Sequence, residues 1–463
     1  MANTIQLKRG NAADWTAADP TLAAGEFGFE ADTGKFKVGN GSAAWTALGY
    51  FEPAAAAAAV FSPALAFTLD NPTAYGTSAS DQFSRSVGIS GDYAIVGAPY
   101  EDDAGGTSSG KAYIYNVTTG ALLHTLNNPT AYGTSASDQF SRSVGISGDY
   151  AIVGAPYEDD AGGTLSGKAY IYNVTTGALL HTLNNPTAYG TSAEDLFGDS
   201  VAISGTYAIV GATGEDDASG TSSGKAYIFD VTTGALVYTL NNPNPYSTSA
   251  NDIFGYSVAI SDNYAIVGAR TEDEASAGTD SGKAYIFDVT TGALVHTLNN
   301  PTAYTTPGYD YFGHSVAISD NYAIVGAVGE DDAGGTTSGK AYIFNVTTGA
   351  LVHTLDNPNA YDTSLNDYFG HSVSISDNYA IVSAYQEDDA GTVLASGKAY
   401  IFDVTTGALV HTLDNPNVYD TSELDNFGYS VAISDNYAIV SANGEDDASG
   451  TSSGKAYIYS LYA

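Results

Sequence analysis

Apolar residues alternate with small or polar residues in four short segments within residues 254–298. The first two segments, residues 255–261 and 264–269, meet at a Ser-Asp-Asn turn sequence, and the last two, 283–288 and 293–298, meet at Val-Thr-Thr-Gly. Alternation with a period of two is typical of β-strands with one buried face, and Asp, Asn and Gly favour tight turns. The pattern therefore predicts a four-stranded antiparallel sheet.

The same unit occurs seven times along the chain, each time opened by a string similar to Phe-Gly-x-Ser-Val. A fixed period of 57 or 58 residues indicates one supersecondary unit that has been copied. Seven such units predict an all-β fold, a seven-bladed β-propeller with four antiparallel strands in each blade. The leading residues of the seven copies are Phe83, Phe140, Phe197, Phe254, Phe312, Phe369 and Phe427.

The two ends of the repeat region complement each other. The seventh copy stops at Ala463 without a fourth strand, whereas residues 64–70 precede the first copy and match residues 408–414 almost position for position. We therefore expect the strand 64–69 to be the outer strand of the last blade, where it shields an otherwise unpaired edge. Residues 64–463 are the predicted propeller domain.

The strand directions also sort the loops. Because consecutive strands run in opposite directions, the loops between the first and second and between the third and fourth strands lie on one face. The two long loops of every blade lie on the other face, which we name the loop face. Binding surfaces are commonly built from loops on a rigid scaffold, so the loop face is the expected binding side.

The charge of the chain excludes several partners. Lysine and arginine number 14 against 52 aspartates and glutamates, a formal net charge of −38. A surface this acidic repels phosphate backbones, so nucleic acid is not an expected partner. No stretch reaches the roughly 20 apolar residues that cross a bilayer, cysteine is absent, and residues 1–25 lack a signal-peptide pattern. We expect no membrane insertion, and assembly in the cytoplasm of the cell that makes the protein.

Each repeat carries an acidic triplet in its second loop and a further aspartate two residues before the leading phenylalanine. Carboxylate clusters suit Ca²⁺, whereas aspartates in loops also cap backbone amides. Acid–base catalysis requires carboxylates in different environments, which seven equivalent copies do not offer, so we expect no enzyme. The candidate Ca²⁺ ligands are Glu101, Asp102, Asp103, Glu215, Asp216, Asp217, Glu330, Asp331 and Asp332.

Two positions differ strongly between the repeats, the x of Phe-Gly-x-Ser-Val and the residue after the second strand. Both are expected around the mouth of the central channel on the loop face. Their diversity is either drift on an unused surface or a ligand site whose Tyr, His and Arg side chains suit a glycan or a protein loop. The candidate receptor-binding residues are Tyr256, Arg270, His314, His371, Tyr385 and Tyr429, with the loop residues Tyr309, Tyr311 and Tyr368.

The repeat resembles the FG-GAP repeat, the unit of integrin α-subunit propellers and of many bacterial and viral surface proteins. The resemblance rests on Phe-Gly-Tyr-Ser-Val at 254–258 and Val-Gly-Ala at 267–269, and it covers residues 64–463. Calcium-binding members of that family carry an Asp-rich cage between the first and second strands. Here that loop is only Ser-Gly-Asp-Tyr or Ser-Asp-Asn-Tyr, so the family's calcium sites are not expected.

Residues 4–50 resemble a different family, the small N-terminal module of bacteriophage tail fibres that includes the phage tropism-determinant group. The segments that carry the resemblance include Ile-Gln-Leu-Lys-Arg-Gly at 5–10 and Asp-Thr-Gly-Lys-Phe-Lys-Val-Gly at 32–39. The resemblance implies a β-rich attachment module over residues 1–51 that contacts other virion proteins and assembles as a homotrimer. An alanine-rich linker over residues 52–63 is expected to be helical or extended.

These features lead to one expected function and one alternative. The expected protein is a virion fibre or adhesin subunit that anchors through its N-terminal module and presents the propeller to a host-surface glycan or protein. The alternative is a structural decoration of the capsid or tail that binds no receptor. A polysaccharide-degrading enzyme of the sialidase kind is not expected, since the chain has four arginines and no Ser-x-Asp-x-Gly-x-Thr-Trp box.

Overall fold

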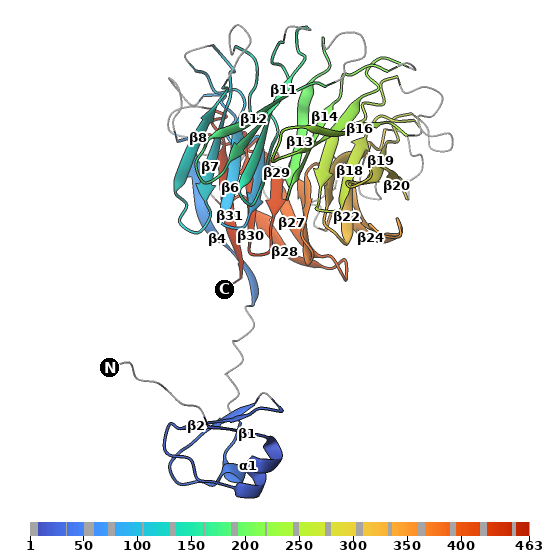
Figure 1. The fold of residues 1–463 in the computed structure, drawn as a ribbon. Helices are drawn as coiled ribbons and strands as arrows, with labels where there is room; N and C mark the ends of the chain where they lie inside the picture. The colour runs from blue at the N-terminus through green and yellow to red at the C-terminus, as the bar shows by residue number, and fades with distance from the viewer. Residues whose placement is uncertain are drawn as a thin grey trace. The chain divides into compact units, whose positions relative to one another are not determined.

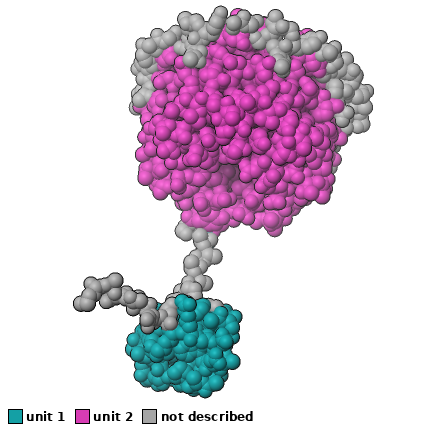
Figure 2. Space-filling view, in the orientation of Figure 1, with its two compact units in different colours: residues 1–60 teal, residues 61–463 magenta. Residues whose placement is uncertain are grey.

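The chain folds into two compact units, residues 1–60 and residues 61–463 (Figures 1 and 2). The computed structural model describes residues 8–462 except 34, 51–59, 73–78, 104–105, 130–135, 161–162, 187–192, 218–219, 244–249, 274–278, 302–308, 332–335, 359–365, 389–394, 417–423 and 447–450. The described residues form one three-stranded sheet in the first unit and seven four-stranded antiparallel sheets in the second. None of their helices has the length and apolar character needed to cross a membrane.

The first unit is built from β1 (Lys8–Gly10), α1 (Ala12–Ala18), β2 (Phe27–Glu30), β3 (Phe36–Val38) and the 3-10 helix η1 (Trp45–Ala47). Its buried apolar cluster contains Trp15, Leu22 and Trp45, and the two indole rings stack with their centroids 4.4 Å apart. The helix α1 was not expected from the sequence. It forms because alanines favour helix and because Trp15 on its inner side completes this cluster.

The seven sheets of the second unit are the blades of the predicted propeller. The first two consist of β5 (Ser86–Ser90), β6 (Tyr93–Ala98), β7 (Lys111–Asn116) and β8 (Leu122–Asn127), then β9 (Val144–Ser147), β10 (Tyr150–Ala155), β11 (Lys168–Asn173) and β12 (Leu179–Asn184). The third and fourth consist of β13 (Phe197–Ser204), β14 (Tyr207–Ala212), β15 (Lys225–Asp230) and β16 (Leu236–Asn241), then β17 (Ser257–Ile260), β18 (Tyr264–Ala269), β19 (Lys283–Asp288) and β20 (Leu294–Asn299).

The remaining three sheets repeat this order. The fifth and sixth consist of β21 (Phe312–Ile318), β22 (Tyr322–Ala327), β23 (Lys340–Asn345) and β24 (Leu351–Asp356), then β25 (Val373–Ile375), β26 (Tyr379–Ala384), β27 (Lys398–Asp403) and β28 (Leu409–Asp414). The seventh consists of β29 (Phe427–Ile433), β30 (Tyr437–Ala442), β31 (Lys455–Tyr462) and β4 (Phe61–Asp70). The all-β fold with seven four-stranded blades is therefore confirmed.

The hydrophobic core lies between neighbouring blades. In the fifth blade, Phe312 is fully buried, and its ring lies 5.8 Å from that of Tyr342 and 6.0 Å from that of Phe344. The same cluster includes Ile266 and Ile286 of the fourth blade. The leading phenylalanine of each repeat thus fills the space between its own blade and the preceding one.

The glycine after this phenylalanine permits a close approach of the two backbones. Gly313 has φ +90°, and a Cβ atom there would lie 2.4 Å from the carbonyl oxygen of Lys283 in the fourth blade. A Cβ atom on Gly268, in the Val-Gly-Ala string of that blade, would lie 2.2 Å from the carbonyl oxygen of Gly313. In the fourth and fifth blades these two glycines are therefore required by the contact between the blades.

The strand contributed from the start of the chain completes the seventh blade, as predicted. β4 pairs with β31 in antiparallel register, with Leu69 opposite Ala456 (Figure 1). β4 begins at Phe61, so residues 61–63 belong to the strand and not to the predicted linker. The reason is that the Phe61 ring stacks on Tyr379 of the sixth blade with 4.3 Å between centroids. The rest of the linker, apart from Val60, lies outside the described residues.

The seventh blade is joined to the first by the same kind of hydrogen bond that joins other pairs of neighbouring blades. The Val87 amide of the first blade donates to Ser430 Oγ of the seventh at 3.1 Å, as the Val144 amide of the second donates to Ser86 Oγ of the first at 3.1 Å. Leu69 joins the apolar cluster between the seventh and first blades. The first and last blades are thus neighbours, and β4 contributes to the contact between them.

We predict that Leu69→Ala lowers the free energy of unfolding by about 2–4 kcal/mol, because it leaves a cavity in the cluster between the first and last blades. Leu65 on the same strand is 44 % exposed, against 4 % for Leu69. Leu65→Ala is therefore the matched control, with an expected change below about 0.5 kcal/mol. Denaturant unfolding followed by circular dichroism measures both. Equal effects of the two substitutions, or unchanged melting after deletion of residues 64–69, would contradict a latch at this position.

Candidate functional site

The variable x residues of the seven repeats meet at one end of the central channel. They line a cavity of about 280 Å³, together with the serines that follow them. The opposite end of the channel is lined by Ser, Asp and Gly residues of the tight turns, which differ little between repeats. The structure thus places the diversity at a single mouth, which we name the channel mouth. Its seven x residues are Arg85, Arg142, Asp199, Tyr256, His314, His371 and Tyr429.

Five of the candidate residues form a continuous arc of rings from the fourth blade to the seventh. The Tyr256 and His314 rings lie 5.3 Å apart, and the His314 and His371 rings lie 5.1 Å apart. The His371 ring also lies 4.2 Å from Tyr385 and 4.8 Å from Tyr429. Because each ring packs on its neighbours, contacts within the protein fix the orientation of the arc.

A second cavity, of about 540 Å³, opens beside this arc. His314 and His371 line both cavities, so the two are adjacent. The second cavity brings the predicted loop residues next to the predicted mouth residues. Its lining includes Arg270, Tyr309, Tyr311, His314, Tyr368, His371 and Tyr385, with Asp310, Val328, Gly329, Asp331, Thr336 and Thr337.

Residues 309–311 are held by the preceding blade. Tyr309 and Tyr311 are in the left-handed region, with φ of +66° and +54°. Their amides donate to the carbonyl oxygens of Thr279 at 2.9 Å and Asp280 at 3.2 Å, in the long loop of the fourth blade. Bonds from a neighbouring blade offset the cost of this backbone conformation. Tyr309, which is 58 % exposed, is therefore displayed on an ordered support.

Three arginines lie at the channel mouth, and two of them were not among the predicted binding residues. The Arg270 guanidinium lies 3.9 Å from the centre of the Tyr256 ring, and that of Arg85 lies 5.1 Å from the Tyr429 ring. Arg142 forms an ion pair with Asp199 at 3.0 Å. Arg85 and Arg142 occupy the same variable x position as Tyr256, so the repeat alignment contained the signal that identifies them.

The two histidines of the mouth are neutral at pH 7. Burial lowers the pKa of His371 to about 4, opposed by the carbonyl oxygen of Tyr429, which lies 3.1 Å from Nδ1. Burial, helped by repulsion from His371 when that ring is protonated and from the Arg270 guanidinium, holds the pKa of His314 well below its ordinary value. Burial likewise raises the pKa of Tyr385 to about 12. The arc therefore offers uncharged rings and hydrogen-bonding groups. The charged side chains lie around it: Arg85, Arg142 with its ion-pair partner Asp199, and Arg270.

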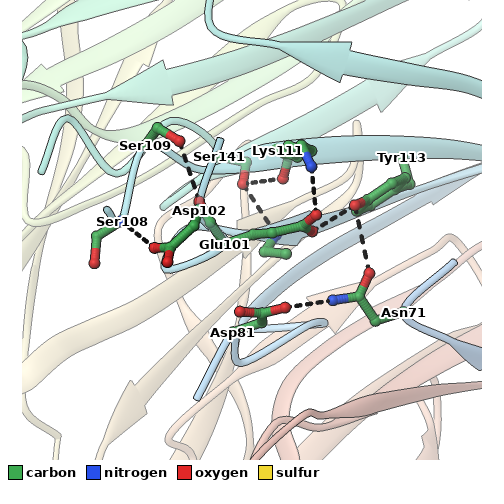
Figure 3. A network of polar contacts seen from close by, with 10 residues as sticks. Asn71, Asp81, Glu101, Asp102, Ser108, Ser109, Lys111, Tyr113 and Ser141 are labelled. Carbon is green, nitrogen blue, oxygen red and sulfur yellow. Dashed lines mark hydrogen bonds and ion pairs between the residues drawn. The ribbon is translucent and has the colours of Figure 1, made fainter. Parts of the chain in front are cut away.

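The glutamate of each acidic triplet is buried inside its blade. In the first blade, Glu101 is fully buried and accepts hydrogen bonds from Lys111 Nζ and Tyr113 OH, each at 2.5 Å (Figure 3). Glu215 is fully buried in the same way and pairs with the equivalent lysine and tyrosine of its blade. Glu330 accepts from its tyrosine at 2.5 Å. These glutamates hold the third strand against the long loop.

The aspartates of the triplets cap their own loops. Asp102 Oδ1 accepts from the Ser108 amide at 2.9 Å, and Asp103 Oδ1 accepts from the Gly106 amide at 3.1 Å. Asp216, Asp217 and Asp331 accept equivalent amide bonds, each at 2.9 Å. Asp332 lies outside the described residues.

This arrangement favours internal pairing over the predicted calcium sites. The carboxylates that were considered either as Ca²⁺ ligands or as loop caps accept bonds from lysine, tyrosine and backbone amides of their own blade. In the part of the chain that the structure describes, no three His, Asp or Glu side chains are grouped so that they could hold a metal ion. The calcium prediction for these triplets therefore has no support in the described geometry.

Comparison with family models assigns both units. The seven blades match the FG-GAP repeat at residues 73–115, 129–172, 186–229, 245–287, 302–344, 359–402 and 419–459. Because these matches cover more than half of the chain, it belongs to the FG-GAP repeat family of β-propeller proteins. Residues 5–43 match the major tropism determinant N-terminal domain. The N-terminal unit is thus similar to a phage tropism-determinant domain and the propeller carries FG-GAP repeats, so both expected resemblances are confirmed. No curated protein matches it.

Each repeat also has a buried aspartate two residues before its leading phenylalanine, on the side of the loop face. Asp81 is 4 % exposed and accepts from Asn71 Nδ2 at 2.9 Å (Figure 3). Burial, together with the charge of Glu101, raises its pKa to about 7. Burial has the same effect on the pKa of five equivalent residues, which is raised to about 7 for Asp138, Asp195, Asp310 and Asp425 and to about 8 for Asp252.

We predict that the propeller is more stable at pH 6 than at pH 8. A carboxyl group whose folded pKa lies above its unfolded pKa near 4 stabilises the fold while it is protonated, and this contribution is lost as the pH rises through the folded value. Each of these aspartates then costs roughly 1 kcal/mol between pH 6 and 8. The pKa values of His314 and His371 are lowered, so these two groups make the fold more stable as the pH rises. They are outnumbered by the six aspartates.

The measurement is the melting temperature at pH 6 and pH 8 at constant ionic strength. Asp252→Asn retains the shape of the side chain but removes its titration, so this variant should show a smaller difference between the two pH values. Asp320→Asn, on an exposed turn at the opposite end of the channel, is the control and should retain the full difference. A melting temperature that does not fall from pH 6 to pH 8 would show that these aspartates titrate normally.

Proposed function

We propose that this protein is a subunit of a phage tail fibre or adhesin, anchored to the virion by its N-terminal unit, whose propeller binds a host receptor at the channel mouth. The observation that carries the proposal is the arc of Tyr and His rings at that mouth, with arginines packed against it. Preorganised aromatic surfaces with a few polar groups suit recognition of a glycan or a protein loop.

The pattern of identity and difference between the repeats supports a binding role for this mouth. Packing of seven equivalent blades is satisfied by one repeated set of residues, as the buried phenylalanines, tyrosines and lysines show. The opposite end of the channel follows the same rule, with Ser-Asp and Ser-Gly turns. The x position instead carries Arg, Asp, Tyr and His. Blade packing does not require this diversity, whereas recognition of an asymmetric ligand does.

The N-terminal unit is proposed to attach the protein to other virion proteins and to assemble as a homotrimer. Its buried apolar cluster of two tryptophans and a leucine is small for an independent domain. Phe27 and Tyr50 are each 39 % exposed and offer apolar surface to a partner chain. The match to the major tropism determinant N-terminal domain supports the same role.

The proposed role at the mouth is binding without catalysis. The two neutral histidines pack on aromatic rings, and the Asp199 carboxylate is engaged by Arg142. A general base paired with a carboxylate, which hydrolytic sites commonly use, is not among the described contacts of the mouth. Release of reducing sugar from host envelope by the purified protein would contradict this part of the proposal.

We predict that simultaneous replacement of Tyr256, His314, His371 and Tyr429 by alanine abolishes the ability of the purified protein to compete with the phage for host cells. The substitutions remove four rings of the arc and leave its loops in place. The matched control replaces four aspartates at the other end of the channel, Asp262, Asp320, Asp377 and Asp435, by alanine and should compete normally. Circular dichroism melting checks that both variants fold.

Full competition by the folded mouth variant would exclude the channel mouth as the receptor site. In that case a structural decoration of the capsid or tail becomes the better explanation. Immunogold labelling of the particle distinguishes the two possibilities, because a fibre subunit should be found on a tail appendage and a decoration on the capsid or tail shaft.

We also predict that the full chain in solution has three times the mass of one polypeptide. Multi-angle light scattering after size exclusion measures this mass directly. Phe27→Ser, which removes exposed apolar surface from the N-terminal unit, should shift the protein toward the monomer. Leu424→Ser in the propeller, where the leucine is 59 % exposed, is the control and should leave the mass unchanged. A monomeric mass for the unmodified chain would contradict the trimer.

A further inference from the structure

The positive charge of the propeller is concentrated at the channel mouth. Of the 14 lysines and arginines in the chain, ten lie in the propeller, and seven of these are the lysines that open the third strand of each blade. Each of these lysines pairs with a carboxylate of its own blade and has a side chain no more than 12 % exposed. The other three are Arg85, Arg142 and Arg270, and all three line the mouth or the cavity beside it.

Two of these three arginines form no ion pair in the described part of the chain. Arg142 is neutralised by Asp199 at 3.0 Å. Arg85 donates to the neutral amide oxygen of Gln82 at 2.9 Å. Arg270 Nη1 lies 3.4 Å from Nδ1 of the neutral His314. The charge of Arg270 acts on the Asp280 carboxyl, but neither Arg85 nor Arg270 forms an ion pair among the described residues. Their guanidinium groups are therefore available to a ligand.

Of Arg85 and Arg270, Arg270 is the better placed to bind an acidic ligand. Its guanidinium lies over the Tyr256 ring at 3.9 Å and near the Tyr311 ring at 5.6 Å, which hold it in one orientation. Its Nε atom is buried and has no hydrogen-bond partner within the described part of the chain. A buried donor without a partner costs free energy that a bound acceptor would recover. An arginine fork that is already oriented suits a carboxylate or phosphate group, which it can bind through two parallel hydrogen bonds.

The cavity around Arg270 suits a saccharide. Its volume of about 540 Å³ falls within the range of roughly 300–1,000 Å³ that is usual for small-molecule sites. Tyr309, Tyr311, Tyr368 and Tyr385 supply flat apolar faces with hydroxyl groups at their edges. Thr336, Thr337 and Asp331 supply further groups that can bond to sugar hydroxyls.

We propose that the cavity beside the channel mouth binds an anionic saccharide, with the acid group on Arg270 and the sugar rings on the surrounding tyrosines. This inference rests on the proposed receptor-binding function and defines its ligand class. The net charge of −38 repels a polyanion at long range, so the preferred ligand is a largely neutral glycan that carries single acid groups. The acid group is a carboxylate or a phosphate, which share the geometry that an arginine fork recognises.

The test is isothermal titration calorimetry on the full chain with four probes. Two carry carboxylates, 3′-sialyllactose and a glucuronate-containing hyaluronan tetrasaccharide; one carries a phosphate, mannose 6-phosphate; and lactose is the neutral reference. We expect at least one acidic probe to bind at least about tenfold more tightly than lactose, since a charge-assisted pair of hydrogen bonds is lost without the acid group. Which acidic probe binds distinguishes the carboxylate from the phosphate.

The decisive variant is Arg270→Gln, which should weaken the binding of the acidic probe by about tenfold or more and leave the affinity for lactose unchanged. Arg9→Gln is the matched control, because it removes the same charge from an exposed arginine in the other unit and should leave all binding unchanged. If Arg270→Gln melts early, Arg270→Lys tests the same point, because lysine retains the charge but lacks the fork. That variant should also bind the acidic probe more weakly than the wild type.

Three results would overturn the proposal: lactose binding as tightly as every acidic probe, no acidic probe binding at millimolar concentration, or a folded Arg270→Gln variant that binds the acidic probe normally. Competition with the phage separates this inference from the proposed function. If Arg270→Gln competes normally while the four-residue mouth variant does not, the receptor function stands and the anionic ligand is wrong. If both variants compete normally, the receptor function itself is wrong.

Discussion

The contact between neighbouring blades is the constraint on which the rest of this structure depends. In each repeat a phenylalanine is buried between two sheets, and in the fourth and fifth blades the glycines at 268 and 313 allow the two backbones to approach so closely that neither position has room for a Cβ atom. In the first two blades Ser84 and Ser141 replace the glycine that follows the phenylalanine. They keep a positive φ of +74° and +77°, and their hydroxyl groups donate to a backbone carbonyl of the preceding blade. Because an equivalent apolar cluster joins every pair of neighbouring blades, it sets the curvature of the array and brings seven equivalent positions to one channel.

The buried carboxylates show how an acidic chain tolerates charge in its interior. Each triplet glutamate is surrounded by the tyrosine of its blade and, in most blades, by the lysine. This arrangement joins the third strand to the long loop and engages five of the seven lysines in the propeller. Lys340 and Lys398 pair with Asp356 and Asp414. Because all seven lysines are paired, the positive charge available to a ligand comes from arginines at positions that the repeat leaves variable. The lysines that stabilise the blades are therefore distinct from the arginines of the proposed binding site.

Much of the fold and part of the site could be predicted from the sequence. The period of the repeat, the alternation within it and the orphan strand before the first copy predicted the blades and the pairing of β4 with β31. The helix α1 and the early start of β4 at Phe61 were missed, because both depend on a contact with a distant residue, the Trp15–Trp45 stack in one case and Tyr379 in the other. The triplets were assigned to loop caps or calcium. The partners of Glu101 could not be foreseen, because Lys111 and Tyr113 come beside it only when the third strand pairs.

By itself, the sequence determined the number of blades, the order of their strands and the sorting of the loops onto two faces. These properties follow from the alternation of apolar and polar residues within each repeat and from the period of 57 or 58 residues, and both can be observed in the sequence alone. Only the tertiary structure decided which side chains face one another across blades. It placed Tyr256 on His314, His314 on His371 and Arg142 on Asp199, all pairs from different repeats. The physical reason is that such contacts depend on the distance and rotation between adjacent sheets, which no single repeat encodes.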